Sequence, residues 1–540
     1  MMSDIKPNRI ADSGTVLFYG LIALLVFAPL FRAGNRPLSL LVMELAALAL
    51  LVWRFWSPPT VEQPLSRSGW IFLALLFLLP LAQLLPAPFG LWADLPGRAF
   101  YAEALRQTSE GADLGWRAIS LIPTETESAW LALLPPLAVF LAAIHLTSQP
   151  LLRLVLVFLG IATAEALLGL IQYGDGSDSV FRLGNTLMGD SASGTYINRN
   201  HLAGLLEMAL PMGLALLAAT VGHGRPSHAS GSRGGRRGRT FRQWLARFSV
   251  ARLNQAALFG AATIAILLGL IFTRSRAGVS LAMLGILLCT LTFSYRLGGR
   301  NVYGLMGTFT AVGVGLAGLI GLAPVWSRFT LQDPIEDGRW KIFDATLQAI
   351  GEFFPLGSGA GTFEDVMRRF HPADFPGVTI NRAHNDYLEW LLEFGLIAGL
   401  LIAVWLLLYL RQWGRVWKRG EWAPFRFAQV GAGIALLLMM LHTLVDFNLR
   451  IPANAVFTAF LAAVFFHPPP EERRAAHRRR ESSGEAHGEG PPALPPSYTI
   501  PPENQANPFA ESPPEVNATG ASLPAAPGAD RAVRRPAAGR

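Results

Sequence analysis

The sequence predicts an all-α polytopic membrane protein with about twelve transmembrane helices and a large extramembrane loop. Of the 540 residues, 51% are hydrophobic and only 15% are charged, whereas a soluble domain carries about 25% charged residues. The mean hydropathy is +0.36. The apolar residues fall in runs of about 17–22, the length needed to cross a bilayer. The twelve expected spans are roughly 14–31, 37–55, 69–86, 129–147, 151–172, 200–221, 255–273, 277–294, 302–322, 386–410, 426–445 and 452–467.

The basic residues between these spans predict the topology, because cytoplasmic loops carry an excess of Lys and Arg. Segment 222–254 has eight arginines and no acidic residue, and 411–420 has four basic residues. With twelve spans, both segments lie on the same side as the N-terminus. We therefore expect a multi-pass membrane protein with both termini in the cytoplasm. The arginines of the first segment are Arg225, Arg233, Arg236, Arg237, Arg239, Arg242, Arg247 and Arg252.

The opposite side receives segment 173–199, the turn at 274–276 and the long loop 323–385. That loop mixes charges with aromatic residues, so we expect it to fold. Segment 88–128 is expected to lie partly in the membrane interface as an amphipathic stretch. Residues 1–467 thus form a transmembrane domain. The remaining 468–540 are rich in Pro, Ala, Gly and Glu, which predicts a disordered cytoplasmic tail.

The composition argues against cysteine-based sites and against a nucleic-acid partner. The single cysteine, Cys289, lies in an apolar run, so one chain cannot form a disulfide or a cysteine-based metal site. The formal net charge is +8, but its arginines cluster between spans as orientation signals do, so no nucleic-acid partner is expected.

Arginines beside the expected outer loops are candidates for binding an anion. Arg274 and Arg276 lie between two apolar runs, and Arg339 lies beside Trp340 in the long loop. A guanidinium matches phosphate oxygens in bidentate geometry. The alternatives are snorkelling at a helix end for the first two and an ordinary loop salt bridge with Asp337 or Asp333 for Arg339.

His384 is the candidate catalytic residue, since it lies between a polar loop and a long apolar helix. The positive end of the helix dipole disfavours an imidazolium there. A neutral ring could accept a proton from a sugar hydroxyl. The alternative is a histidine that only caps the helix. Arg382 and Asn385 flank it and are possible substrate-binding residues.

Three further segments carry polar residues at loop-to-helix boundaries. Asn198, Arg199 and Asn200 could read sugar hydroxyls, although one of the two asparagines could simply cap a helix. Asp446 and Arg450 are expected to pair as a structural clamp. The glycine-rich run 355–365 is expected to form a turn into a short helix at 362–370, with Thr362 as its N-cap.

Together, these pieces resemble the O-antigen ligase/polymerase superfamily of bacterial envelope glycosyltransferases. The order of the motifs carries the resemblance, and it covers about residues 150–410. It comprises Asn198-Arg199-Asn200-His201, Ser275-Arg276-Ala277-Gly278, Gly338-Arg339, the glycines at 357, 359 and 361, and His384-Asn385.

The resemblance implies a GT-C-like fold and a metal-independent, cofactor-free inverting transfer. A glycan would pass from an undecaprenyl diphosphate-linked oligosaccharide to a hydroxyl acceptor at the periplasmic face. By this resemblance Arg276 and Arg339 hold the diphosphate, with Arg274 as an extra cation, and His384 activates the acceptor. The acceptor could be lipid A core (a ligase), another glycan (a polymerase) or a protein hydroxyl. Membrane lipids would surround the chain.

The main alternative from another class is a polysaccharide-related secondary transporter or flippase, because twelve spans suit that class too. Transporters place charged binding residues near the membrane midplane on broken helices. Here the candidate residues collect at one surface, which favours an enzyme. A non-catalytic scaffold is the other alternative, and it predicts that replacing His384 leaves function intact.

Overall fold

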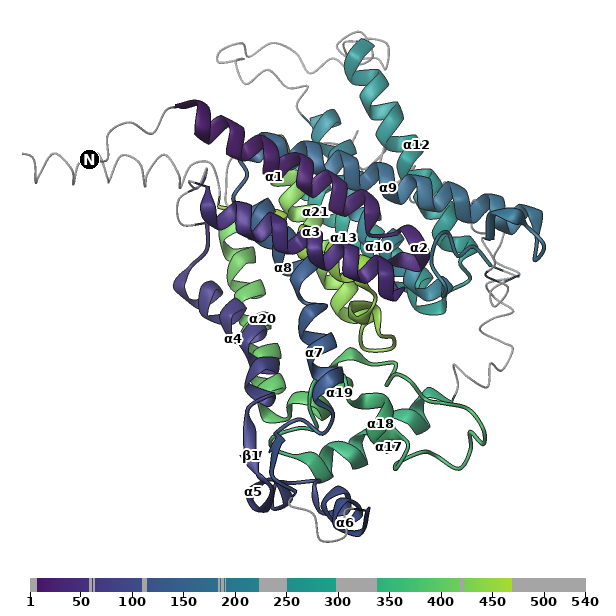
Figure 1. The fold of residues 1–540 in the computed structure, drawn as a ribbon. Coiled ribbons are helices and arrows are strands. Elements are labelled where there is room, and N and C mark those ends of the chain that lie inside the picture. The colour runs from purple at the N-terminus through teal and green to yellow at the C-terminus, as the bar shows by residue number, and fades with distance from the viewer. Residues whose placement is uncertain are drawn as a thin grey trace, which may run out of the picture. The chain divides into compact units, whose positions relative to one another are not determined.

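The computed structural model describes residues 7–57, 61, 64–108, 114–182, 185, 189, 191–222, 250–297, 338–417 and 422–468. Within these ranges the chain is helical with one small sheet, which confirms the predicted all-α membrane fold (Figure 1). The membrane helices are α1 (Pro7–Phe27), α3 (Pro37–Trp56), α4 (Arg67–Gln83), α7 (Pro123–Leu131), α8 (Leu134–Ile144), α9 (Ser148–Asp175), α10 (Arg199–Gly222), α12 (Val250–Phe272), α13 (Arg276–Leu297), α20 (Leu396–Val416), α21 (Pro424–His442) and α22 (Pro452–Phe466).

Eight spans among the described residues are long and apolar enough to cross a bilayer, and one of them joins α7 and α8 into Pro123–Ile144. Three shorter apolar helices (Gly14–Phe27, α4 and α22) match further expected spans. Eleven of the twelve expected spans therefore have a helical counterpart. The expected span 302–322, most of the basic segment 222–254 and the tail from 469 lie outside the described residues.

Helix α10 lies at the centre of the bundle. The apolar stretch of α10 within Arg199–Val221 is completely buried. Helix α10 packs against α9, α12, α13 and α21. Small residues permit the close approach: a Cβ at Gly278 of α13 would lie 2.6 Å from the Cβ of Ala203 in α10. The Asn198–His201 segment opens this central helix, so its polar side chains start from the most enclosed element of the fold.

Two segments far apart in the sequence form one folded unit, here called the loop unit, from residues 86–122 and 338–394. Figure 1 shows its helices beyond the ends of α4 and α7. A short antiparallel sheet pairs β1 with β2, with Pro86 opposite Ala118. Within the expected amphipathic segment 88–128, the described residues 88–108 and 114–122 thus belong to this folded unit. The elements of the unit are β1 (Pro86–Pro88), α5 (Phe89–Ala93), α6 (Ala99–Thr108), β2 (Trp116–Ala118), α17 (Arg339–Phe353), α18 (Phe363–Met367) and α19 (Asp386–Phe394).

Arg98 ties the two segments of the loop unit together. Its guanidinium is fully buried and donates hydrogen bonds to the carbonyls of Pro96, Ile119 and Gly357 at 3.0, 2.7 and 3.0 Å. Gly357 has φ +82°, and a Cβ there would lie 2.4 Å from the carbonyl oxygen of Glu393. Glycine is therefore needed where this loop touches the end of α19.

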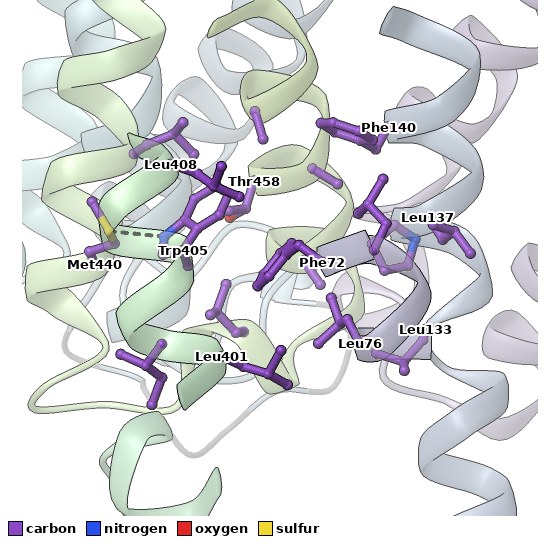
Figure 2. A pocket seen from close by; sticks show the side chains of 18 of the residues that line it. Phe72, Leu76, Leu133, Leu137, Phe140, Leu401, Trp405, Leu408, Met440 and Thr458 are labelled. Carbon is purple, nitrogen blue, oxygen red and sulfur yellow. Dashed lines mark hydrogen bonds between the residues drawn. The ribbon is translucent and has the colours of Figure 1, made fainter. Parts of the chain in front are cut away.

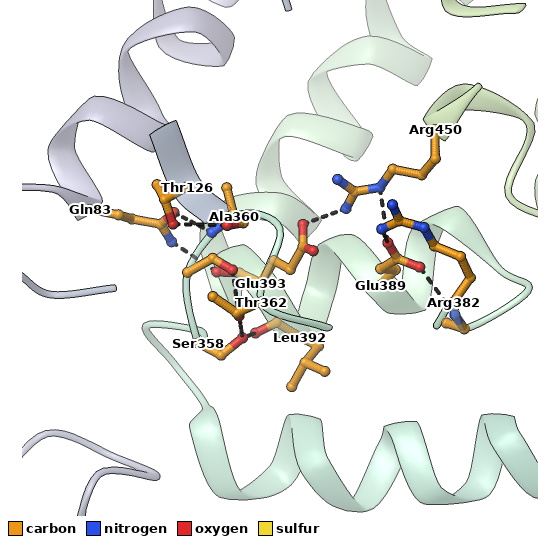
Figure 3. A network of polar contacts seen from close by, with 12 residues as sticks. Gln83, Thr126, Ser358, Ala360, Thr362, Arg382, Glu389, Leu392, Glu393 and Arg450 are labelled. Atoms are coloured by element: carbon orange, nitrogen blue, oxygen red, sulfur yellow. Dashed lines mark hydrogen bonds and ion pairs between the residues drawn. The ribbon is translucent and has the colours of Figure 1, made fainter. Parts of the chain in front are cut away.

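The glycine-rich run leads into α18, as predicted, but its capping differs from the prediction. The Thr362 side chain makes no capping bond to α18. Its hydroxyl instead donates to the Gly359 carbonyl at 2.7 Å and contacts the Ser358 hydroxyl at 2.7 Å. Figure 3 shows this cluster, where the Gln83 side chain also accepts from the Ala360 amide at 2.9 Å. The run thus anchors the loop unit to the end of α4.

The expected single span 386–410 is wrong in one respect, because the chain breaks at Gly395. Helix α19 ends there and α20 begins at Leu396. Gly395 has φ +58°, and a Cβ would lie 2.0 Å from the Pro355 carbonyl oxygen. Packing against the glycine-rich run therefore separates α19 from the membrane helix and frees it to belong to the loop unit.

Candidate functional site

Asp446 lies at the centre of a buried polar cluster between α21 and α22. Its side chain is fully buried. His384 Nδ1 and His201 Nε2 lie 3.6 and 3.7 Å from its Oδ1, and an Arg339 guanidinium nitrogen lies 3.5 Å from its Oδ2. Arg339 also donates to the Val445 carbonyl at 2.5 Å. Three motifs that together span more than 180 residues thus meet at one carboxylate.

The charge state of Asp446 follows from these neighbours. Burial alone would raise the pKa of the carboxyl group. The imidazoles of His201 and His384 and the Arg339 guanidinium outweigh burial and hold the pKa of Asp446 well below its usual range. A carboxylate that stays ionised can orient a neighbouring imidazole through one ring nitrogen and leave the other to act on a substrate.

The backbone holds His384 in an uncommon conformation in front of α19. Its φ is +51°, the left-handed region that few non-glycine residues adopt. Asn385, not His384, caps the helix: its side chain accepts from the amides of Tyr387 and Leu388 at 3.0 and 3.1 Å. The Phe447 ring packs edge-on against the His384 ring at 5.0 Å. With Asn385 as the cap, His384 is left to face Asp446.

Arg276 and Arg339 line the same pocket, which has a volume of about 300 Å³. Asn200 lines it as well, and its Oδ1 is buried without a hydrogen-bond partner. Arg276 begins α13, so the positive end of that helix adds to the two guanidinium charges. Arg274 has φ +57° in the preceding turn and is not among the described residues that line this pocket.

The three polar residues at the start of α10, namely Asn198, Arg199 and Asn200, have different roles. Asn198 caps the helix, because its Oδ1 accepts from the Asn200 amide at 2.9 Å. Arg199 is 7% exposed and Asn200 is 6% exposed. His201, in the same motif, faces Asp446. Among the asparagines, only Asn200 reaches the arginine-lined pocket.

The expected pair between Asp446 and Arg450 is wrong. Arg450 instead bonds Glu393, and its Nε lies 3.0 Å from Glu389 Oε1. Arg382 donates to the same Glu389 oxygen at 3.0 Å, as Figure 3 shows. Both carboxylates are fully buried. Arg382 therefore helps fix the loop in front of His384 to α19, while Asp446 remains available to His201, His384 and Arg339.

Asp386, the first residue of α19, supports a pH prediction. Burial raises its pKa to about 8, although its carboxylate accepts from the Leu449 amide at 3.0 Å. In the unfolded chain an aspartate has a pKa of about 3.9. The protonated Asp386 therefore stabilises the fold fully below that pH, and this stabilisation is lost as the pH rises towards 8. Asp386→Asn should therefore unfold at a higher temperature than the parent chain near pH 8.

Thermal unfolding of the purified protein in nanodiscs between about pH 4 and 8 measures this difference. The gap between the two proteins should close near pH 4. Asp344→Asn, at an exposed position of α17, is the matched control and should track the parent chain at every pH. Parallel curves for Asp386→Asn would contradict a buried, protonated carboxyl group.

A second pocket, of about 270 Å³, is almost wholly apolar and lies among membrane helices (Figure 2). Residues of α4, α8, α20, α21 and α22 line it, and Asp386 and Tyr387 of α19 line it as well. Trp405 on its wall donates to the Met440 sulfur at 3.2 Å. The pocket offers a hydrocarbon environment that reaches the residues directly after His384. Phe72, Leu76, Leu133, Leu137, Phe140 and Leu401 are among the residues drawn in Figure 2.

The site is spread over five segments of the chain, and the match to a known family covers three of them. Residues 261–403 match the family model described as O-antigen ligase. This stretch of the chain is similar to the O-antigen ligase family. The match includes Arg276, Arg339 and His384, and it confirms the resemblance to the O-antigen ligase superfamily. Comparison with curated proteins gives no match.

The matched stretch 261–403 does not contain all of the polar cluster. The Asn198–His201 segment precedes it and Asp446 follows it. Sequence reasoning singled out the first segment but assigned Asp446 to the wrong partner. Glu389 and Glu393 could have indicated the true partner of Arg450, because two buried carboxylates one helical turn apart need a cation nearby. Because Arg450 pairs with Glu389 and Glu393, Asp446 interacts instead with His201, Arg339 and His384.

Proposed function

We infer that the chain is a membrane-bound, glycosyltransferase-like enzyme of O-antigen ligase/polymerase type, because residues 261–403 match the O-antigen ligase family model. We propose that it transfers a glycan from an undecaprenyl diphosphate-linked donor to a hydroxyl acceptor, at the periplasmic face of the inner membrane. The observation that carries this proposal is the convergence of Arg276 and Arg339 on one pocket, with His384 and Arg339 both beside Asp446.

The arginine-lined pocket suits the diphosphate of the donor. Two guanidinium groups and the N-terminus of α13 place positive charge where the leaving group gains negative charge. Asn200 also lines the pocket, where the N–H groups of its side-chain amide could donate to a phosphate oxygen. Because the arginines neutralise the diphosphate, the proposed transfer needs no metal ion. The apolar pocket in Figure 2 supports a lipid substrate, since a hydrocarbon chain can lie there among the membrane helices.

His384 would activate the acceptor. Asp446 orients the ring through Nδ1, and the other nitrogen takes the proton of the acceptor hydroxyl. The hydroxyl oxygen then bonds to the anomeric carbon while the bond from that carbon to the diphosphate oxygen breaks. Attack opposite the leaving group inverts the configuration. The diphosphate leaves with both electrons of the broken bond, held by Arg276 and Arg339.

Product analysis tests the proposal most simply. The purified chain in nanodiscs is incubated with lipid-linked oligosaccharide and with each acceptor class: lipid A core, lipid-linked glycan and a hydroxyl-bearing protein. Mass spectrometry then identifies the product. Transfer to one acceptor class, unchanged by EDTA, is expected, and it decides between ligase, polymerase and protein glycosylation. Movement of the lipid-linked glycan across the bilayer without any covalent product would favour a transporter instead.

The proposed sidedness has its own test. The arginine-rich segment 222–254 predicts that this part of the chain is cytoplasmic and that the loop unit is periplasmic. A reporter fused after Gly235 should be active only as a cytoplasmic reporter, and one fused near Pro372 only as a periplasmic reporter. The reverse pattern would put the Asp446 cluster on the cytoplasmic side and overturn the proposed donor and acceptor.

A further inference from the structure

A third pocket, remote from the Asp446 cluster, lies in the loop unit. It has a volume of about 300 Å³ and is walled by α5, α6 and β2 together with the residues after β2. This volume is at the lower end of the range for small-molecule sites, about 300–1,000 Å³. Its lining combines aromatic rings, aliphatic side chains and one guanidinium, namely those of Trp92, Tyr101, Leu105, Arg117 and Leu121.

Two polar atoms of this pocket are buried without a hydrogen-bond partner. They are the indole Nε1 of Trp92 and the hydroxyl oxygen of Tyr101. Trp92 is only 3% exposed. A buried N–H or O–H without a hydrogen-bond partner is destabilising, because it has lost its hydrogen bonds to water. Such groups in a pocket wall therefore favour a ligand that offers hydroxyl oxygens.

The mixed lining selects the chemistry of that ligand. A pyranose ring has an apolar C–H face, which packs on aromatic and aliphatic side chains, and a rim of hydroxyls, which bond to an indole N–H, a phenol and a guanidinium. We propose that this pocket, here called the glycan subsite, binds one sugar unit of the substrate glycan. The inference rests on the proposed glycan transfer and adds a second contact to the same substrate.

The location implies a sugar beyond the one that reacts. The pocket residue Leu121 donates to the Ser358 carbonyl at 2.9 Å, and the Ser358 amide donates to the Leu392 carbonyl at 2.9 Å. Leu392 is near the end of α19 opposite to His384. At about 1.5 Å per residue, the two ends are roughly 10 Å apart. The glycan subsite should therefore hold the distal part of a long chain and contribute little to a single repeat unit.

Filling the glycan subsite tests this inference. Ala104 lines the pocket from an exposed position of α6, so Ala104→Trp fills it without displacing buried side chains. Gln107→Trp, at an exposed position of α6 outside the pocket lining, is the matched control. The probe is the host cell's own surface glycan, released from its lipid and labelled with fluorescein. Its binding to the protein in nanodiscs is measured by fluorescence anisotropy.

We expect Ala104→Trp to raise the Kd for the long labelled glycan about tenfold, which corresponds to about 1.4 kcal/mol, while the control binds as the parent chain does. In transfer assays kcat/KM should fall by a similar factor with a ten-repeat lipid-linked donor and stay unchanged with a single-repeat donor. Equal binding by both variants, no binding by the parent chain, or equal loss with both donors would overturn the glycan subsite. Binding that is lost in Ala104→Trp, with no transfer by the parent chain, would leave the subsite standing and reject the proposed reaction.

Discussion

His384→Ala should retain its fold and its donor binding but lose glycan transfer by a factor of roughly 10²–10⁴, the usual value of general base assistance. The reason lies in the geometry around Asp446. The His384 side chain is 17% exposed, with Nδ1 3.6 Å from a carboxylate that is held ionised. Removing the ring leaves the acceptor hydroxyl without a proton acceptor. Donor recognition by Arg276 and Arg339 does not need the imidazole.

The measurement follows donor binding and product formation on the same purified variant. His371→Ala is the matched control, because His371 also belongs to the loop unit but bonds only to the Val378 carbonyl in an exposed position. The control should transfer at the parent rate. Normal turnover in His384→Ala would remove the catalytic assignment. Loss of both fold and donor binding would make His384 a structural residue.

Replacing Arg276 or Arg339 should also lower the transfer rate strongly, because both residues are proposed to stabilise the donor diphosphate. Removing one preorganised charge donor from a transition state typically costs about 10²–10³ in rate, so we expect that loss for each Arg→Ala variant. Arg→Lys keeps the charge but loses the bidentate fork, so transfer should fall less, by about tenfold. The order Arg, Lys, Ala should hold at both positions.

Initial rates and donor affinity for the four variants measure this order. Arg368→Ala is the control, since Arg368 is exposed on the same loop unit and pairs only with acids of its own helix, Glu364 and Asp365. Arg339 also holds Asp446 and the Val445 carbonyl, so its variants should lose more stability than those of Arg276. Full activity of Lys at both positions would argue against bidentate diphosphate binding.

The membrane helices could be predicted from the sequence because apolar length and composition alone determine them. Every expected span within the described residues has a helical counterpart. The break at Gly395 could not be predicted, because the apolar run continues through it. Contact with the carbonyl oxygen of Pro355, a residue forty positions earlier, decides that break. The folding of the long loop was predicted, but its union with residues 86–122 was not, because Arg98 joins segments more than 200 residues apart.

In the candidate site, too, the features set by local sequence could be predicted and those set by long-range contacts could not. Arg276, Arg339 and His384 carry a recognisable residue type at a helix boundary, and the structure brings them to one region. Asp446 was expected to pair with Arg450 because the two residues are only four positions apart in the sequence. Long-range competition decides otherwise: Glu389 and Glu393 engage Arg450. Trp92 and Tyr101 gave no signal, because an unsatisfied polar atom is visible only in three dimensions.

The most direct test of the central claim is a cryo-electron microscopy structure of the purified chain with undecaprenyl diphosphate bound. The proposal places the diphosphate between the guanidinium groups of Arg276 and Arg339, beside Asn200, with the lipid tail among the membrane helices. Diphosphate density in that pocket would support transfer at the Asp446 cluster. Density at the opposite ends of the helices, with the arginine-lined pocket empty, would contradict it.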